Sequence, residues 1–356
     1  MKMKKSISSY IEMLRTVLAI FISLLIVFAI ILLVSKEPLT ALQSFVLGPM
    51  MSLRRFGNVI EAMIPLIFTG MAVIILFRPG LFNLSMEGGF FLGAVAACAS
   101  ALTVKAPGIL GLMIAMLVGS LVGGLTTSIP GVLSVKTGAN VLVTSLMLNY
   151  ICLFFGSWII STFLYDPTQN VNYSYKFPEN VCLPNLIPGT RVSTGFVIAI
   201  GTVLLVYLFL NKTSLGLKAT LVGKNRRMAD YSGISSDKVI LLTQALGGML
   251  AGLGASVELF GMYKRFQYSS LPGYGWDGVL IAIVAKNKIQ YVPIAAFFLA
   301  YLRIGADIMS RTTDIPFEIV NIIQAVMVLL ISATAILSGV KKKMIIREAV
   351  SANQLK

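Results

Sequence analysis

An acidic residue within a long apolar stretch is the first sign of a functional site in this sequence. The segment 81–93, LFNLSMEGGFFLG, contains Glu87 followed at once by Gly88 and a second glycine. A carboxylate near hydrocarbon costs at least ~2.5 kcal/mol, so such groups usually face protein or a water-filled path. Glycines let backbone or ligand approach closely and permit a break in a helix. The combination predicts a site within a membrane, although Glu87 would also suit an ion pair with Arg78 or a cap on the following helix.

Two further segments carry polar or aromatic groups in apolar surroundings. Within 136–150, Asn140 and Thr144 stand four residues apart and share a face if the segment is helical. Within 271–279, two rings and an acid lie among glycines, and aromatic rings stack on flat solutes. The substrate path is therefore predicted to involve the polar, aromatic and glycine residues Asn83, Glu87, Gly88, Asn140, Thr144, Asn149, Tyr274, Trp276 and Asp277. Two alternatives stay open, because polar groups also bond neighbouring membrane helices and Trp and Tyr also anchor at membrane interfaces.

A basic segment between two apolar stretches has the composition of a docking element. It mixes positive charges with an acid, a tyrosine and two turn-prone glycines, which is unlike a helix that only rests on anionic lipid. The candidate docking residues are Gly223, Asn225, Arg226, Arg227, Ala229, Asp230 and Gly233. Contact with membrane lipid remains the alternative interpretation.

Composition identifies the class of protein. Of the 356 residues, 57% are hydrophobic and 12% are charged, whereas soluble domains carry roughly 25% charged residues. The net charge of +15 is expected from Lys and Arg collecting in cytoplasmic loops, so no nucleic-acid partner is expected. The chain has no histidine, and the cysteines Cys98, Cys152 and Cys182 lack metal-like spacing. Histidine-based catalysis is therefore excluded, and we expect no catalytic residue, no metal site and no disulfide.

Apolar stretches near ~20 residues recur along the chain, and each suffices to cross a ~30 Å hydrocarbon core as a helix. The alternating ~10-residue segments that are typical of a β-barrel are not seen. The fold class is therefore predicted to be all-α, a polytopic membrane protein with about ten transmembrane helices. The predicted crossings are 17–34, 59–77, 86–104, 108–129, 142–164, 193–211, 239–261, 274–285, 290–306 and 318–340. The eighth is too short to span unaided, which predicts a short or broken helix.

The distribution of basic residues predicts the orientation. An even number of crossings puts both termini on one side, and most of the 29 lysines and arginines then fall on that side. By the positive-inside rule this side is the cytoplasm. We therefore expect a multi-pass protein of the inner (cytoplasmic) cell membrane with both termini inside. It would form a single transmembrane domain over 1–356, with an external loop at 164–192 and the basic loop 212–238 in the cytoplasm.

A possible duplication links the third and eighth predicted crossings. The sequence MEGG begins at residue 86 and WDG begins at residue 276, and each opens a crossing. If the crossings around them are related, the chain contains an inverted repeat of two five-helix halves. Many transporters are built this way, with sites at the repeat interface. Chance explains one acid–glycine coincidence equally well.

The same segments resemble a known family in their order and spacing. These are FNLSMEG at 82–88, GANVLVTSLMLNY at 138–150, the stretch 223–234 and PGYGWDG at 272–278. Together they resemble the nucleoside (simple-sugar-type) permease subunits of ATP-binding-cassette (ABC) importers. Those subunits lie within the broader branched-chain amino acid and ribose permease family, and the resemblance covers roughly 38–340.

The resemblance implies partners for this chain. The stretch 216–234 resembles the coupling element that docks on a cytoplasmic ATPase subunit, which uses ATP and Mg. The resemblance also implies a second homologous permease subunit and an external substrate-binding protein, soluble or lipid-anchored. The chain departs from the family at Met228, which replaces the first alanine of a pair, and at Val141, where relatives commonly carry Glu. The second departure bears on the identity of the substrate.

The sequence has no Gly-x-x-x-x-Gly-Lys-Ser/Thr phosphate loop, so we expect no ATPase site and no cofactor in this chain. The predicted function is a non-enzymatic permease subunit of an ABC importer for nucleosides. The alternative is a secondary transporter driven by an ion gradient, in which Glu87, Glu258 or Asp307 would serve as the proton-coupling group. A membrane-embedded enzyme is disfavoured because the sequence has neither histidine nor a paired-acid metal cluster.

Overall fold

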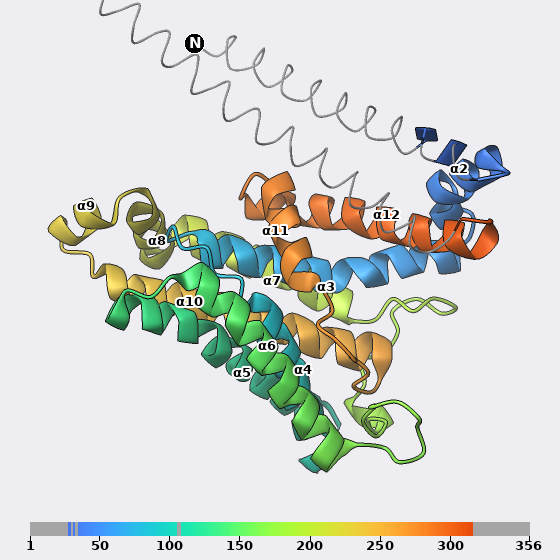
Figure 1. The fold of residues 1–356 in the computed structure, drawn as a ribbon, viewed down its shortest axis with the longest axis horizontal. Coiled ribbons are helices and arrows are strands. Elements are labelled where there is room, and N and C mark those ends of the chain that lie inside the picture. The colour runs from blue at the N-terminus through green and yellow to red at the C-terminus, as the bar shows by residue number, and fades with distance from the viewer. Residues whose placement is uncertain (1–27, 30, 33–34, 105–107, 316–356) are drawn as a thin grey trace, which may run out of the picture. The chain divides into compact units, whose positions relative to one another are not determined.

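The computed structural model describes residues 28–29, 31–32, 35–104 and 108–315, and most of these residues lie in helices (Figure 1). No β-strand occurs within them apart from two isolated bridges. The α-helices in chain order are α2 (Pro38–Val46), α3 (Leu53–Phe77), α4 (Met86–Thr103), α5 (Gly108–Thr137), α6 (Val141–Ile159), α7 (Gly195–Lys212), α8 (Ser214–Lys224), α9 (Arg226–Tyr231), α10 (Ser236–Glu258), α11 (Tyr274–Val284) and α12 (Val292–Thr312). Short 3-10 turns lie at η1 (Gly48–Met50), η3 (Glu179–Val181) and η5 (Ile289–Tyr291), and π-helical turns follow α6 at η2 (Ile160–Leu164) and α10 at η4 (Leu259–Tyr263).

Seven helices of the described residues are long and apolar enough to cross a membrane, which confirms the prediction of a polytopic all-α membrane protein. They are Leu53–Phe77, Met86–Thr103, Gly108–Thr137, Val141–Leu164, Gly195–Lys212, Ser236–Tyr263 and Ile289–Thr312. The helix α11 has 11 residues and is too short to span. The predicted crossing 318–340 and most of 17–34 lie outside the described residues, so the total of ten stays a prediction.

Two elements differ from what the sequence predicts. The helix α5 continues to Thr137, past the predicted end at 129, although Pro130 lies inside it. Prolines are tolerated in membrane helices because neighbouring helices satisfy the freed backbone groups. The basic loop 212–238 is largely helical, since it holds α8, α9 and the start of α10. Its polar sequence hid two short helices that begin with side-chain caps, from Thr213 to the Gly216 N–H and from Asn225 to the Met228 N–H.

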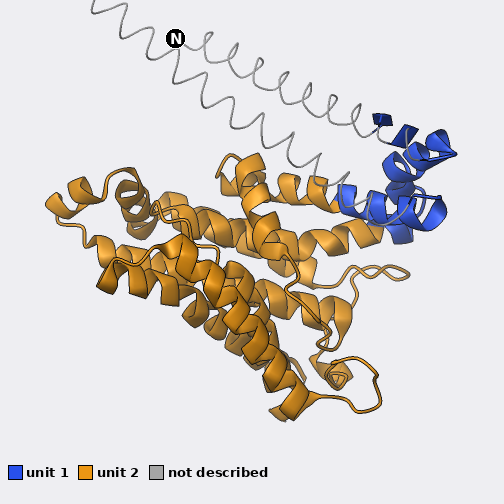
Figure 2. Ribbon diagram, in the orientation of Figure 1, with its two compact units in different colours: residues 1–56, 301–356 blue, residues 57–300 orange. Residues whose placement is uncertain are grey.

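The chain divides into two compact units (Figure 2), one of residues 1–56 with 301–356 and one of residues 57–300. In the first unit, the chain before α2 is bonded to the end of α12. The Asp314 carboxylate accepts hydrogen bonds from the Ser35 hydroxyl at 2.7 Å and from the Lys36 N–H at 2.9 Å. The Tyr301 hydroxyl donates to the carbonyl of Val46 at the end of α2. These bonds join segments from the two ends of the described chain.

The second unit has a core in which α4, α5 and α10 pack backbone to backbone. A Cβ placed on Gly93 of α4 would lie 2.7 Å from the Cα of Gly252 in α10. A Cβ on Gly123 of α5 would lie 2.5 Å from the carbonyl oxygen of Gly248. Small residues allow such close approach, which replaces the hydrophobic driving force that is missing between helices in lipid. The glycines of these three helices therefore fix the frame on which the site is built.

Candidate functional site

Glu87 joins two helices that are far apart in sequence. It lies in the first turn of α4 and is 3% exposed. Its carboxylate accepts hydrogen bonds from the backbone N–H of Gly273 at 2.6 Å and from that of Gly275, at the start of α11. The first N–H groups of a helix lack internal partners and carry partial positive charge, so a carboxylate satisfies both needs. We call Glu87 with Gly273 and Gly275 the acid–glycine junction.

The junction explains why the sequence has glycines here. Gly273 adopts φ +83°, a left-handed conformation that favours glycine. A Cβ on Gly275 would lie 2.8 Å from the Cβ of Glu87, closer than two carbon atoms can approach. The two acid–glycine motifs that suggested a duplication are thus in direct contact. The cap predicted for the following helix is not found at α4, whose N-cap residue Ser85 makes no side-chain cap bond; Glu87 instead bonds the start of α11, and Arg78 donates to the Thr220 hydroxyl at 3.0 Å.

A second buried acid, Glu258, is hydrogen-bonded to the first residue of α11 through the Tyr274 side chain. Glu258, the last residue of α10, is 2% exposed. Its carboxylate accepts hydrogen bonds from the Tyr274 hydroxyl at 2.5 Å and from the Tyr268 hydroxyl at 2.7 Å. Burial and the adjacent Glu258 charge raise the pKa of Tyr268 well above its ordinary value, so this hydroxyl remains a donor at neutral pH. The Tyr274 ring also packs on Phe90 of α4, with 5.0 Å between ring centroids.

Two amides tie the approach to α4 to its neighbours. The Asn149 side chain of α6 accepts from the Gly88 N–H at 2.9 Å and donates to the Leu84 carbonyl at 3.0 Å. Asn83 is fully buried, donates to Gln244 Oε1 at 2.7 Å and to the Thr127 carbonyl at 2.9 Å, and accepts twice from Ser85. All four hydrogen-bonding positions of Asn83 are thus used inside the bundle. It positions the chain that leads into α4.

The structure brings together only part of the predicted substrate path. Glu87, Gly88, Asn149 and Tyr274 lie around the junction through the contacts above, and Asp277 is 7% exposed in the first turn of α11. Three predicted residues lie elsewhere or point outward, namely Asn140, Thr144 and Trp276. Asn140 is the N-cap of α6, accepting from the Leu142 N–H at 2.9 Å, and the Thr144 hydroxyl donates back to the Asn140 carbonyl at 3.0 Å. Trp276 is 59% exposed.

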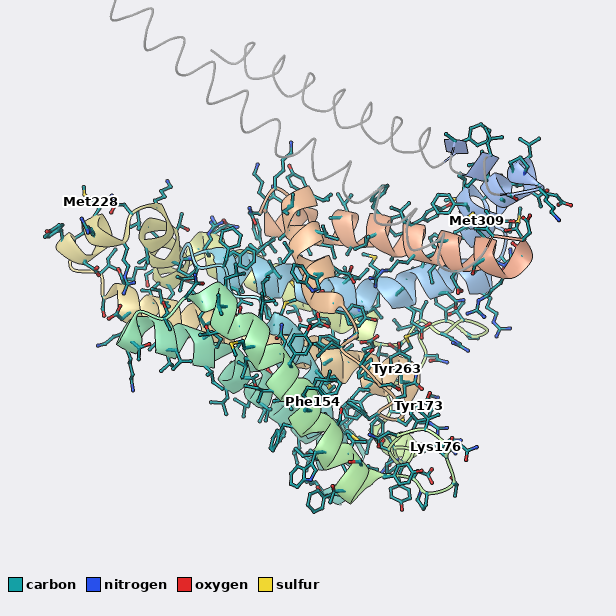
Figure 3. The ribbon with its side chains drawn as sticks, in the orientation of Figure 1. Phe154, Tyr173, Lys176, Met228, Tyr263 and Met309 are labelled. Carbon is teal, nitrogen blue, oxygen red and sulfur yellow. The ribbon has the colours of Figure 1, made fainter. Side chains whose placement is uncertain are left out.

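The predicted docking residues form a small helical hairpin at one end of the second unit. In Figure 1, α8 and α9 lie at the end opposite the segment 165–194, and Figure 3 shows Met228 at its tip. Ala229 is buried in an apolar cluster with Ala219, Val222, Val239 and Ile240. On the outside of α9, Met228 is 65% exposed and Tyr231 is 90% exposed. The hairpin thus packs on a small core that it shares with the start of α10, and it presents two large side chains, Met228 and Tyr231, outward.

Polar contacts fix the turn that follows α9. The Arg226 guanidinium pairs with the Asp237 carboxylate at 2.5 Å. Asp230 accepts from the Ser236 N–H at 3.2 Å, and bonds from the Ser236 hydroxyl and N–H hold the pKa of Asp230 below its usual range. Gly233 adopts φ +80° in this turn, and its N–H donates to the Asp230 carbonyl at 3.0 Å. No ion pair of Arg227 is found within the described residues.

The hairpin contacts the chain that leads to the acid–glycine junction. Gly223 of α8 lies against the 78–80 turn so closely that a Cβ there would overlap the Arg78 carbonyl oxygen. We expect Gly223→Ala to lower the free energy of unfolding by at least about 1 kcal/mol, as overpacking does. The matched control is Gly201→Ala in α7, where a Cβ meets nothing within 4 Å and helix propensity should add about 0.5–1 kcal/mol. Thermal unfolding of both purified variants measures the difference, and equal midpoints would contradict the close contact.

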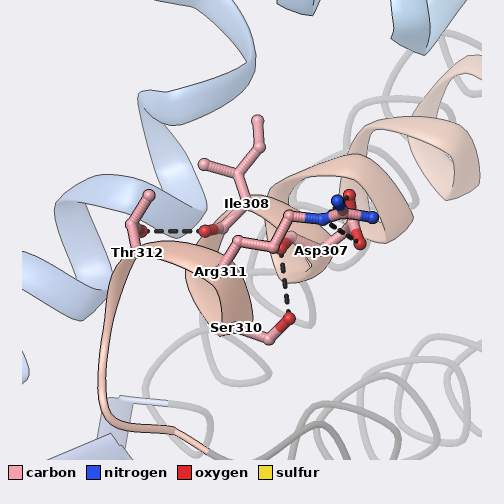
Figure 4. A network of polar contacts seen from close by, with 5 residues as sticks. All are labelled: Asp307, Ile308, Ser310, Arg311 and Thr312. Atoms are coloured by element: carbon pink, nitrogen blue, oxygen red, sulfur yellow. Dashed lines mark hydrogen bonds and ion pairs between the residues drawn. The ribbon is translucent and has the colours of Figure 1, made fainter.

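Asp307, one of the three acids named for proton coupling, forms a local ion pair in α12. The Arg311 guanidinium donates to its two carboxylate oxygens at 2.9 and 3.0 Å (Figure 4). The Arg311 side chain is 75% exposed. An exposed pair four residues apart stabilises a helix by a few tenths of a kcal/mol, and this geometry gives Asp307 a structural role.

Sequence reasoning missed two contacts of the site and one further buried acid. The bond from Tyr268 to Glu258 and the bond from the Gly273 N–H to Glu87 could not be predicted, because each depends on chain segments that meet in space. Glu61, near the start of the predicted crossing 59–77, is also an acid beside an apolar segment and was passed over. It is 5% exposed, and its Oε1 has no hydrogen-bond partner among the described residues. The rule that a buried membrane acid marks function applies to it as well.

Comparison with known proteins identifies the family. The model of the family described as "Branched-chain amino acid transport system / permease component" matches residues 55–332. The chain belongs to this family. The resemblance to ABC importer permeases is thereby confirmed, and this chain, like its relatives, is a transport component rather than an enzyme.

Individual relatives agree with this assignment. The chain is 32% identical to the glucose ABC transporter permease protein TsgB13 of Haloferax volcanii, over 77% of this chain and 76% of the relative. It is 30% identical to the guanosine ABC transporter permease protein NupP of Bacillus subtilis, covering 78% and 81%. It is 28% identical to the nucleoside ABC transporter permease protein NupB of Lactococcus lactis, covering 92% of both chains. The similarity thus extends over almost the whole length of the last.

Proposed function

We propose that this chain is the permease subunit of an ABC importer for nucleosides. The carrying observation is the acid–glycine junction, in which the start of the short helix α11 is held by Glu87. Interrupted helices within a membrane bundle are where many transporters bind their solutes. The relatives named for guanosine and nucleoside transport support the solute class.

The junction also favours an uncharged solute. In transporters that bind anions, the positive end of a half-helix points at the anionic group of the substrate. Here the Glu87 carboxylate already occupies the positive end of α11, and a second acid, Glu258, lies beside Tyr274. An anionic solute approaching this helix would meet two negative charges. A neutral nucleoside would not, and Tyr274 offers it a ring surface.

The helical hairpin of α8 and α9 is proposed to be the coupling element. It would dock on a separate cytoplasmic ATPase subunit that binds ATP and Mg, through Met228, Tyr231 and Arg227. Large exposed side chains of this kind anchor protein interfaces. A second homologous permease subunit and an external substrate-binding protein would complete the complex. In this arrangement the α8–α9 end faces the cytoplasm and the segment 165–194 faces outward.

The wider architecture is part of the proposal. We infer ten crossings with both termini in the cytoplasm of a cell membrane, which places the seven observed spans and α11 between two further helices near 17–34 and 318–340. The contact between the starts of α4 and α11 is compatible with an inverted repeat. The substrate path would run along Glu87, Gly88, Asn149, Tyr274 and Asp277.

Reconstitution tests this function directly. Proteoliposomes that contain the chain with its ATPase, second permease and binding protein are expected to concentrate radiolabelled uridine only when ATP is supplied. A protonophore should leave this uptake unchanged, which separates the proposal from a proton-coupled transporter. The chain alone, with a uridine gradient imposed, should move nothing uphill. Concentrative uptake by the chain alone would contradict the proposal.

A further inference from the structure

A cavity at the far end of the second unit from α8 and α9 is lined by a buried acid, Glu61. It has a volume of about 370 Å³ and is lined by Glu61, Asn185, Arg191, Tyr263, Lys264 and Gln267, among others. A second cavity of about 600 Å³ adjoins it and shares three of these residues. Pockets that bind small molecules commonly have volumes of about 300–1,000 Å³. The first of these cavities, called here the Glu61 cavity, is therefore large enough for a small solute.

Glu61 places a hydrogen-bond acceptor without a partner among the described residues at this cavity. The side chain is 5% exposed, and its Oε1 is buried without a hydrogen-bond partner among the described residues. One turn earlier in α3, Asn58 Oδ1 is also buried and unpartnered within the described residues. More than about 90% of buried polar groups in folded proteins are hydrogen-bonded. Of these two atoms Glu61 Oε1 belongs to a residue that lines the cavity, and a bound molecule that supplies a donor would satisfy it.

The wall of the Glu61 cavity is firmly built. The segment 165–194 is bonded to the end of α10, where the Leu183 N–H donates to the Phe260 carbonyl at 2.9 Å and the Phe177 N–H donates to the Lys264 carbonyl at 2.9 Å. Lys264 ends the π-helical turn with φ 57°, which redirects the chain beside the cavity. Figure 3 labels Tyr263, the last residue of η4, and Lys176 on the segment 165–194. The cavity is thus shaped by ordered backbone on several sides.

The other lining groups complement a solute with both donors and acceptors. Arg191 and Gln267 supply N–H donors, and Tyr263 supplies a flat ring. A molecule that satisfies this set would carry hydroxyls for the carboxylate, carbonyl or ring-nitrogen acceptors for the guanidinium and amide, and a flat face. A ribonucleoside has all three features.

We propose that the Glu61 cavity is a solute-binding station at the mouth of the transport path, in which Glu61 accepts the ribose hydroxyls of a nucleoside while Arg191 and Gln267 bond its base. This assignment rests on the proposed function and deepens it, because it locates the group that distinguishes sugar hydroxyls. It is separate from the acid–glycine junction, to which Glu61 contributes no contact.

The test uses the complete transporter in proteoliposomes with two probes, uridine and 2′,3′-dideoxyuridine. Replacing Glu61 by glutamine removes a charge-assisted acceptor, whose loss corresponds to a KM increase for uridine of about 10- to 100-fold. The KM for dideoxyuridine, which lacks the hydroxyls, should change by less than about threefold. The matched control is Asp166→Asn, because Asp166 lies in the same segment 165–194 and its carboxylate accepts hydrogen bonds only from Thr168 among the contacts described. This control should leave both KM values unchanged.

The outcomes separate the site from the function. If the wild-type transporter takes up no nucleoside, the proposed function fails. If it takes up uridine and the E61Q variant keeps the wild-type KM, or raises the KM of both probes equally, the cavity assignment fails alone. Stronger competition by uridine monophosphate than by uridine would assign the cavity to phosphate and overturn the proposal. Should E61Q not assemble, Gln267→Leu provides the second variant, with a KM increase expected for both probes, since both carry the base.

Discussion

Replacing Glu87 by alanine is expected to destabilise the transporter and to abolish uptake. The change leaves the N–H groups of Gly273 and Gly275 without the acceptor that they have in the native junction. A buried donor that loses its partner costs about 1–3 kcal/mol, so the free energy of unfolding should fall by about 2–6 kcal/mol. Uptake should be lost because α11 no longer holds the position that the path requires. Thermal unfolding of the purified complex and uridine uptake measure the two effects.

Three further variants sharpen this prediction. Glu87→Gln keeps one acceptor oxygen and should give an intermediate loss of stability. Tyr274→Phe removes the hydroxyl that donates a hydrogen bond to Glu258, and so tests the second contact that positions α11. Glu179→Ala, at an exposed acid of the covering segment, should stay within about 0.5 kcal/mol of the wild type. Wild-type stability and uptake in the Glu87→Ala variant would show that the junction is not what positions α11.

Reversing the charge of Arg227 is expected to uncouple ATP hydrolysis from uptake. Arg227 lies on α9, and no ion pair satisfies it within the described residues, so its charge is available to a partner. Close charge pairs at protein interfaces couple by about 1.5–7 kcal/mol, and losing one should lower ATP-driven uptake at least tenfold. Because Arg227 is exposed, the thermal stability of the isolated subunit should not change. Comparing ATPase rates and uptake rates in proteoliposomes measures the coupling.

Arg226 provides the contrast, because it has a partner inside this chain. Its pair with Asp237 is about half exposed on both sides, with side-chain exposures of 48% and 53%. Arg226→Asp should therefore weaken the hairpin modestly, by at most about 1 kcal/mol, and adding Asp237→Arg should restore it. Lys212→Glu, at an exposed basic residue ending α7, controls for net charge. We propose that Arg227 contacts the ATPase and that Arg226 stabilises the hairpin. Recovery of uptake in Arg227→Glu on addition of salt alone would contradict the first role, and failure of the Arg226–Asp237 swap to restore stability would contradict the second.

The sequence predicted the fold class and most helices because hydrophobic stretches carry that information locally. It also singled out Glu87 and the glycines near 273, since an acid and turn residues in an apolar stretch are visible without a structure. The pairing of these two segments was not predictable in its geometry. Glu87 caps α11 across 186 positions of sequence, and only the packing of α4, α5 and α10 brings the two together.

Two of the predicted path residues have structural roles. Asn140 caps α6, and Asn83 uses its hydrogen-bonding positions inside the bundle. The same types of polar residue hydrogen-bond neighbouring helices and line solute paths, so sequence alone does not distinguish a structural residue from a path residue. The bounds of α8 and α9 were not predicted, because short polar helices depend on caps and on a small shared core.

The glycine contacts between α4, α5 and α10 restrict how this permease can move. Where main chains touch, no side chain is available to rotate aside, so sliding one helix past another would drive carbonyl oxygens into Cα atoms. Separating them would lose the close van der Waals contacts that hold glycine-faced helices together in lipid. The three helices must therefore travel as one rigid body through the transport cycle. Solute passage then depends on movement of the elements next to this rigid body. One of them is α11, whose first turn is hydrogen-bonded to Glu87 and Glu258, and breaking these bonds would let α11 move and open the path.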